Sequence, residues 1–68
     1  MNEDHLNMEI RRFLKKVGIT SQREIEKHLY EAEKKGSIKA NDEIDLQMTL
    51  KIKQLDVNYI IDGKIKIE

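Results

Sequence analysis

The chain has no cysteine and no proline, and its only aromatic residues are one phenylalanine and two tyrosines. Without cysteine, neither a disulfide nor a thiolate zinc site can stabilise the fold. Without proline, no segment resembles a rigid linker, and the three glycines, at positions 18, 36 and 63, lie where element boundaries are expected. The sequence therefore predicts one small domain over residues 1–68, with a modest core that association could reinforce.

The chain also lacks net charge, because 13 lysines and arginines balance 13 aspartates and glutamates. The absence of net charge removes the long-range field that concentrates polyanions, which disfavours nucleic acid as a partner. No apolar run approaches the roughly 20 residues that a membrane span needs, and the N-terminus, with Glu3 and Asp4, does not resemble a secretory signal. These features predict a cytoplasmic protein that does not bind membranes.

Apolar residues at helical spacing predict a first amphipathic helix over about residues 3–17, with the stripe Leu6, Ile10, Phe13, Leu14 and Val17. Gly18 is expected to end it in a left-handed conformation. Ser21 and Glu24 have capping-box spacing, with Thr20 as the alternative cap. A second helix is predicted over about residues 21–35, with Ile25, Leu29 and Ala32 facing inward and Gly36 as its C-terminal cap. The two helices would form an αα corner.

The spacing of apolar residues changes to two after Gly36, which predicts strands. Apolar residues alternate with polar ones over about residues 43–53, from Ile44 to Ile52. A four-residue connection would place Val57 opposite Ile52 and begin a second strand over about residues 57–61. Asp62 and Gly63 predict a tight turn, for which a three-residue loop with a bulge at Gly63 suits the apolar pattern better than a two-residue loop.

After that turn, a third strand is predicted over about residues 64–67. The predicted fold is α+β in the order ααβββ, with two helices packed on one face of a three-stranded antiparallel meander. In this arrangement the first strand overhangs the central one near Ile44 and Leu46. The overhang would either recruit a second copy of the chain, also burying the outward Ile60, or be frayed or covered and protected by its acidic residues.

The opening Met1-Asn2-Glu3-Asp4 and the segment from Phe13 to Glu26, Phe-Leu-Lys-Lys-Val-Gly-Ile-Thr-Ser-Gln-Arg-Glu-Ile-Glu, resemble a family of short bacterial proteins known as a domain of unknown function. The close resemblance covers mainly the first 26 residues; beyond Lys27 it extends in outline to the helix, the β-rich tail and the Asp-Gly turn. It implies a bacterial origin and no activity, cofactor or binding residue.

A weaker resemblance is to winged-helix domains, in which a β-hairpin wing follows a helix-turn-helix. It implies contacts with nucleic acid from Ser21, Gln22, Arg23 and Lys27, and from wing lysines at positions 51, 53, 64 and 66. The chain departs from that pattern because it lacks a supporting third helix and because the second predicted helix carries as many glutamates as cations. Nucleic-acid binding is therefore the alternative function.

No constellation predicts an enzyme, a cofactor or a metal site. His5 with Glu9, and Glu24 with His28, share a helix face at a spacing of four, but two ligands do not define a metal site. The favoured function is non-catalytic binding of an unknown protein partner or weak homodimerisation. Across both functions, the candidate interaction residues are Gln22, Arg23, Lys27, Tyr30, Ile44, Leu46 and Ile60.

Overall fold

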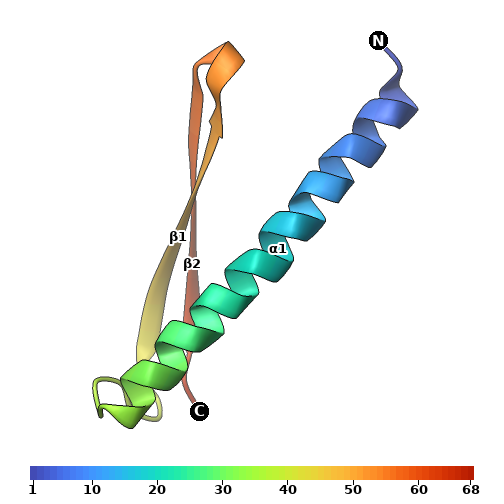
Figure 1. Ribbon diagram of the computed structural model, residues 1–68. Coiled ribbons are helices and arrows are strands. Elements are labelled where there is room, and N and C mark those ends of the chain that lie inside the picture. The colour runs from blue at the N-terminus through green and yellow to red at the C-terminus, as the bar shows by residue number, and fades with distance from the viewer. The chain divides into compact units, whose positions relative to one another are not determined.

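The computed structural model describes residues 1–68, which divide into two units, Met1–Ser37 and Ile38–Glu68. The first unit holds one helix, α1 (Glu3–Lys34), and the second holds two strands, β1 (Glu43–Ile52) and β2 (Val57–Lys66) (Figure 1). A short 3₁₀ helix, η1 (Lys53–Leu55), joins the strands. The class is α+β, but the prediction of two helices and three strands is wrong, because the chain forms one helix and one hairpin.

The first unit begins with a capped helix. The side-chain oxygen of Asn2 accepts a hydrogen bond of 3.1 Å from the backbone N–H of His5, which satisfies one of the free donors of the first turn. Glu3 and Asp4 follow in that turn, where the positive end of the helix dipole favours carboxylates. α1 therefore begins close to the predicted residue.

The predicted αα corner is wrong, since α1 runs without a break through Gly18 and Ser21 (Figure 1). Gly18 is not among the residues with positive φ, so it does not end a helix. A glycine inside a helix costs about 0.5–1 kcal/mol relative to alanine. A break in the helix would cost more, because it would leave several backbone N–H and C=O groups without their helical hydrogen bonds. The spacing of four from Val17 through Ser21 to Ile25 continues the inner stripe across the supposed corner.

The C-terminal end of α1 confirms the cap predicted at Gly36, whose φ is +74°. The N–H of Ser37 donates to the carbonyl of Ala32 at 2.9 Å, and the N–H of Gly36 donates to the carbonyl of Glu33 at 3.0 Å. These two bonds define a Schellman motif, in which the left-handed residue lets the chain turn back over the last free carbonyls. Gly36 thus ends a helix as predicted, whereas Gly18 does not.

In the second unit, the pairing of β1 with β2 confirms the predicted start of the hairpin. Ile52 lies opposite Val57, Leu50 opposite Tyr59, and Met48 opposite Ile61, in an antiparallel ladder. The connection contains η1 and ends at Asp56, whose φ of 54° is left-handed, a conformation that aspartate tolerates better than most residues. The alternation from Ile44 to Ile52 and the four-residue connection therefore set this register.

The predicted turn at Asp62 and Gly63 is wrong, because β2 continues through both residues to Lys66. Gly63 lies opposite Leu46 within the ladder, and Ile65 lies opposite Ile44. The predicted overhang of β1 and the separate third strand are therefore also wrong. The physical reason is that an uninterrupted β2 pairs the whole length of β1, whereas a turn would leave the backbone groups near Ile44 without partners.

A bulge closes the far end of the ladder, just before β1. The N–H groups of Asn41 and Ile67 donate to the carbonyls of Ile67 and Asp42 at 2.6 and 2.9 Å, so two residues of one strand oppose Ile67. Asn41 has a φ of 74°, and the carboxylate of Asp42 accepts a bond of 2.9 Å from the N–H of Lys39. This turn fixes where β1 begins.

Neither unit contains a core of its own, and no residue of the chain is buried. Neither a single helix nor a two-stranded sheet encloses an interior by itself, so the apolar side chains of each unit stay at least partly accessible.

Candidate protein-interaction surface

One face of the hairpin carries apolar side chains at every position but one. We call it the apolar face; it consists of Ile44, Leu46, Met48, Leu50 and Ile52 of β1 and Val57, Tyr59, Ile61, Gly63 and Ile65 of β2. The side chains share this face because successive residues of a strand point to opposite sides and the register pairs like with like. Within this face Tyr59 is 61% exposed and Ile61 53% exposed, whereas Ile44, Leu46 and Ile65 are half-buried.

The opposite face is polar apart from Ile60, which is 54% exposed. Across the strands, the amide of Gln47 donates a hydrogen bond of 3.1 Å to the carboxylate of Asp62. The ammonium of Lys64 lies 4.0 Å from the carboxylate of Glu43. Both contacts are solvent-exposed and contribute little to stability, so this face gives the hairpin solubility and register rather than a core.

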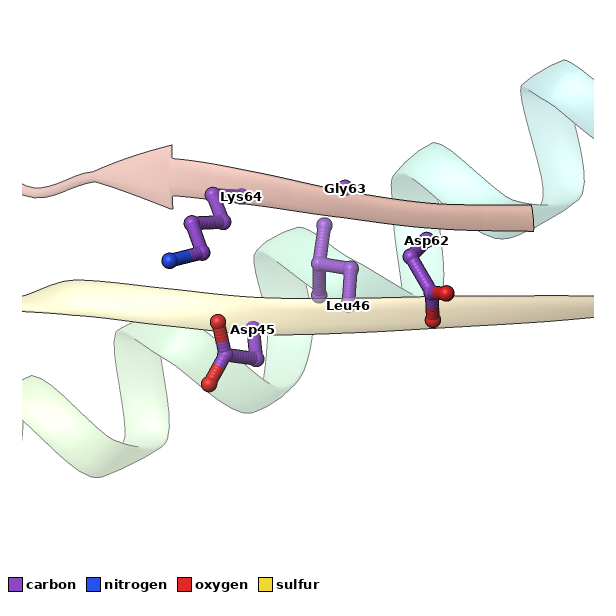
Figure 2. Close-up of a pocket in the computed structure, with 5 residues that line it drawn as sticks. All are labelled: Asp45, Leu46, Asp62, Gly63 and Lys64. Carbon is purple, nitrogen blue, oxygen red and sulfur yellow. The ribbon is translucent and has the colours of Figure 1, made fainter.

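A shallow hollow of about 400 Å³ lies beside Gly63, bordered by residues of both the apolar and the polar face. Asp45, Leu46, Asp62, Gly63 and Lys64 line it, and Figure 2 shows Leu46 reaching from β1 toward the backbone of β2 at Gly63. A Cβ atom placed on Gly63 would meet nothing within 4 Å. The apolar face therefore has open space at Gly63, where its other positions carry side chains.

The helix presents its own apolar stripe. Leu6 is 37% exposed, Ile10 46% and Phe13 55%. The stripe continues through residues that are partly exposed, namely Val17, Ser21, Ile25, Leu29 and Ala32. From Val17 to Leu29 the spacing is four residues throughout, and each step of four overshoots a full helical turn by about 40°. The stripe therefore winds gradually around α1.

The candidate interaction residues do not form one site. Gln22, Arg23, Lys27 and Tyr30 lie exposed along the C-terminal half of α1, and the hydroxyl of Tyr30 donates to the carboxylate of Glu26 at 3.4 Å. Ile44 and Leu46 lie together on the apolar face, half-buried, whereas Ile60 lies on the polar face. The winged-helix residues were chosen for the start of a second helix, and they lie instead within a continuous one.

The sequence reasoning missed the surface itself. The predicted meander, with two helices on one face, makes that face a core, whereas Val57, Tyr59 and Ile61 are exposed. One signal was available in the length of β1, which has ten residues. A two-stranded ladder of that length presents a long surface that no third strand supports.

The two histidine–carboxylate pairs are present on α1. The imidazole of His5 lies 4.0 Å from the carboxylate of Glu9, and that of His28 lies 3.4 Å from the carboxylate of Glu24. Glu9 also binds the guanidinium of Arg12 at 3.0 Å. No group of three or more histidine, aspartate or glutamate side chains is arranged to hold a metal ion. In this structure the pairs act as surface contacts between neighbouring helical turns.

Comparison with known protein families decides the relationship of the chain. A model described as "Family of unknown function (DUF6494)" matches residues 1–68. The chain belongs to this family. The resemblance to short proteins of a domain of unknown function is thereby confirmed over the whole sequence rather than its first part. Comparison with curated proteins and with solved structures finds no match. The structure contains no helix whose length and apolar composition suffice to cross a membrane.

Proposed function

We propose that this chain is a small non-catalytic domain of the bacterial cytoplasm that acts by binding protein through the apolar face of its hairpin. One observation carries the proposal: nine apolar side chains and Gly63 share one face of a two-stranded sheet that has no third strand. Contiguous apolar surface on a small domain is typical of a protein-binding site. An isolated hairpin is only marginally stable in water, so a partner on this face would also stabilise the fold.

The make-up of the face also supports a protein partner. Its large flexible side chain, Met48, and its aromatic side chain, Tyr59, are of the types enriched at interface centres. The polar face opposite carries charges of both signs, Glu43 and Asp45 as well as Lys64 and Lys66. That mixture suits exposure to water and offers no continuous positive surface for a phosphate backbone.

Nucleic-acid binding stays the alternative prediction, and no specific observation now favours it. It depended on a helix-turn-helix, and the segment that would form the corner is part of α1. Its predicted contacts Arg23 and Lys27 alternate on that helix with Glu24 and Glu26. Binding to nucleic acid would have to use a different geometry from the one the resemblance implied.

The test compares two variants of the chain in the cells that produce it. Leu50→Glu places a carboxylate in the middle of the apolar face, and Asn58→Glu places the same group on the polar face as a matched control. Each tagged variant is cross-linked in the cell, co-purifying proteins are identified, and any captured protein is then titrated against the purified chain. We expect a captured protein, or an untagged copy of the chain, to bind the wild type and Asn58→Glu and to lose affinity for Leu50→Glu.

A second variant separates lost binding from lost folding. Tyr59→Ala shortens a side chain that is 61% exposed and leaves the backbone pairing unchanged, so circular dichroism should match the wild type while affinity falls. If neither Leu50→Glu nor Tyr59→Ala changes the affinity of any captured protein or of self-association, the apolar face is not a binding surface and the proposal is wrong.

A further inference from the structure

The backbone of β1 is unpaired along one edge. The sheet has two strands in the order β1-β2, so each strand uses one side for the ladder and leaves the other free. The N–H of Ile67 donates to the carbonyl of Asp42, and by the alternation of an antiparallel ladder the even-numbered residues of β1 bond to β2. The N–H and C=O groups that point to the free edge therefore belong to Glu43, Asp45, Gln47, Thr49 and Lys51.

The side chains of those five residues form a charge gradient along the polar face. Glu43 and Asp45 are acidic, Gln47 and Thr49 are neutral, and Lys51 is basic. Within the chain, Asp45 and Lys51 have no ion pair, and Glu43 has only its 4.0 Å contact with Lys64. These charges can therefore pair with the opposite charges of a strand that runs in the opposite direction.

We infer that a second copy of this chain associates with the first, its β1 pairing antiparallel with β1 along the free edge. With Gln47 opposite Gln47 of the other copy, Lys51 comes opposite Glu43, and Thr49 comes opposite Asp45. These pairs join residues whose backbone groups point outward, so the register satisfies the hydrogen bonds and the charges together. A parallel copy would instead oppose Glu43 to Glu43 and Lys51 to Lys51, which is unfavourable.

The free edge of β2 fits a second copy less well. The residues whose backbone groups point to this edge are Asn58, Ile60, Asp62, Lys64 and Lys66, with both lysines at one end. An antiparallel copy centred on Ile61 brings Lys64 opposite Asn58 and Asp62 opposite Ile60, so no opposite charges meet. A copy centred on Gly63 opposes Asp62 to Lys64 but sets Lys66 opposite Ile60, which leaves the second lysine unpaired. Two lysines on this edge, against one on β1, also disfavour pairing with further chains. The dimer therefore uses β1 and leaves β2 as a protected outer edge.

Pairing through β1 extends the proposed binding surface, and the inference rests on that proposed function. The strand order becomes β2-β1-β1-β2, and the register places Leu46 opposite Met48 and Ile44 opposite Leu50 of the other copy. All these residues belong to the apolar face, so two apolar faces merge into one across four strands. The interface uses the same edge of both copies, which closes the assembly at two chains.

Sedimentation equilibrium on the full-length chain over a wide concentration range tests this inference. We expect a species of twice 8.1 kDa at high concentration. Lys51→Glu opposes two carboxylates at both symmetric positions and should raise the dissociation constant about tenfold. Glu43→Lys should act similarly, and the double variant should restore the wild-type value within a factor of about two. Lys66→Glu makes the same charge change on β2 and should leave the dimer unchanged.

Two outcomes would overturn the inference. One is a single species of 8.1 kDa at every concentration. The other is a dimer that responds equally to Lys51→Glu and Lys66→Glu, or that the double variant fails to restore, because either result puts the interface elsewhere. A monomeric chain whose apolar face still binds another protein would refute the second copy as partner and leave the proposed function standing.

Discussion

Replacing Gly18 by alanine should stabilise this chain, because the residue lies inside a continuous helix. Its φ is not positive, and a Cβ atom there would meet nothing within 4 Å. Alanine therefore gains the helix propensity that glycine lacks, about 0.5–1 kcal/mol, without a steric penalty. For a domain of this size, that gain corresponds to a rise in melting temperature of about 2–8 °C.

Gly36→Ala is the matched control, since it makes the same chemical change at the residue that does end α1. Its φ of +74° forces a side chain into the left-handed region, which costs roughly 1–2 kcal/mol. Thermal unfolding followed by circular dichroism should therefore move in opposite directions for the two variants. A loss of stability in Gly18→Ala as large as that in Gly36→Ala would refute the continuous helix and reinstate a helix end at Gly18.

Four further substitutions test individual features by the same thermal measurement. Asn2→Ala removes the N-terminal cap of α1 and should lower the free energy of unfolding by about 1 kcal/mol. Ser21→Ala lies inside the helix and should be neutral or slightly stabilising. A larger loss of stability in Ser21→Ala than in Asn2→Ala would place a helix cap at Ser21. Asp56→Gly relieves a left-handed residue in the hairpin connection and should not lower the melting temperature, and a clear loss would show that the aspartate side chain holds the turn. Ile60→Lys lies on the polar face and should change stability by less than about 0.5 kcal/mol, so that a large loss would show that Ile60 is packed.

Local patterns predicted the parts of the fold that depend on local chemistry. The alternation in β1, the four-residue connection and the glycine at position 36 gave the first pairs of the hairpin and the C-terminal end of α1. Each of these features is decided within a few residues. The side of the strand on which Ile44 and Leu46 lie followed from the same alternation.

The wrong predictions share one physical cause. Gly18 and Gly63 were interpreted as boundaries because glycine tolerates turns, but tolerance does not require a turn. At Gly18 the helical hydrogen bonds continue, and at Gly63 the ladder with β1 continues, so in both places long regular pairing outweighs a local preference. The alternation within the strands places these residues on one face, but it does not show which elements lie against that face.

The local topology of this chain, one helix and one hairpin with a short connection, has a consequence for how quickly the chain folds. Turns of α1 bond residues four apart, and the hairpin joins strands separated only by Lys53 to Asp56. Helices of such local contacts relax in about 0.1–1 μs and hairpins form in about 1–10 μs, and a chain without proline has no slow X-Pro isomerisation. After dilution from denaturant, we therefore expect any refolding phase slower than about 10 μs to reflect association of two chains rather than folding of one. The rate of such a phase should increase with protein concentration.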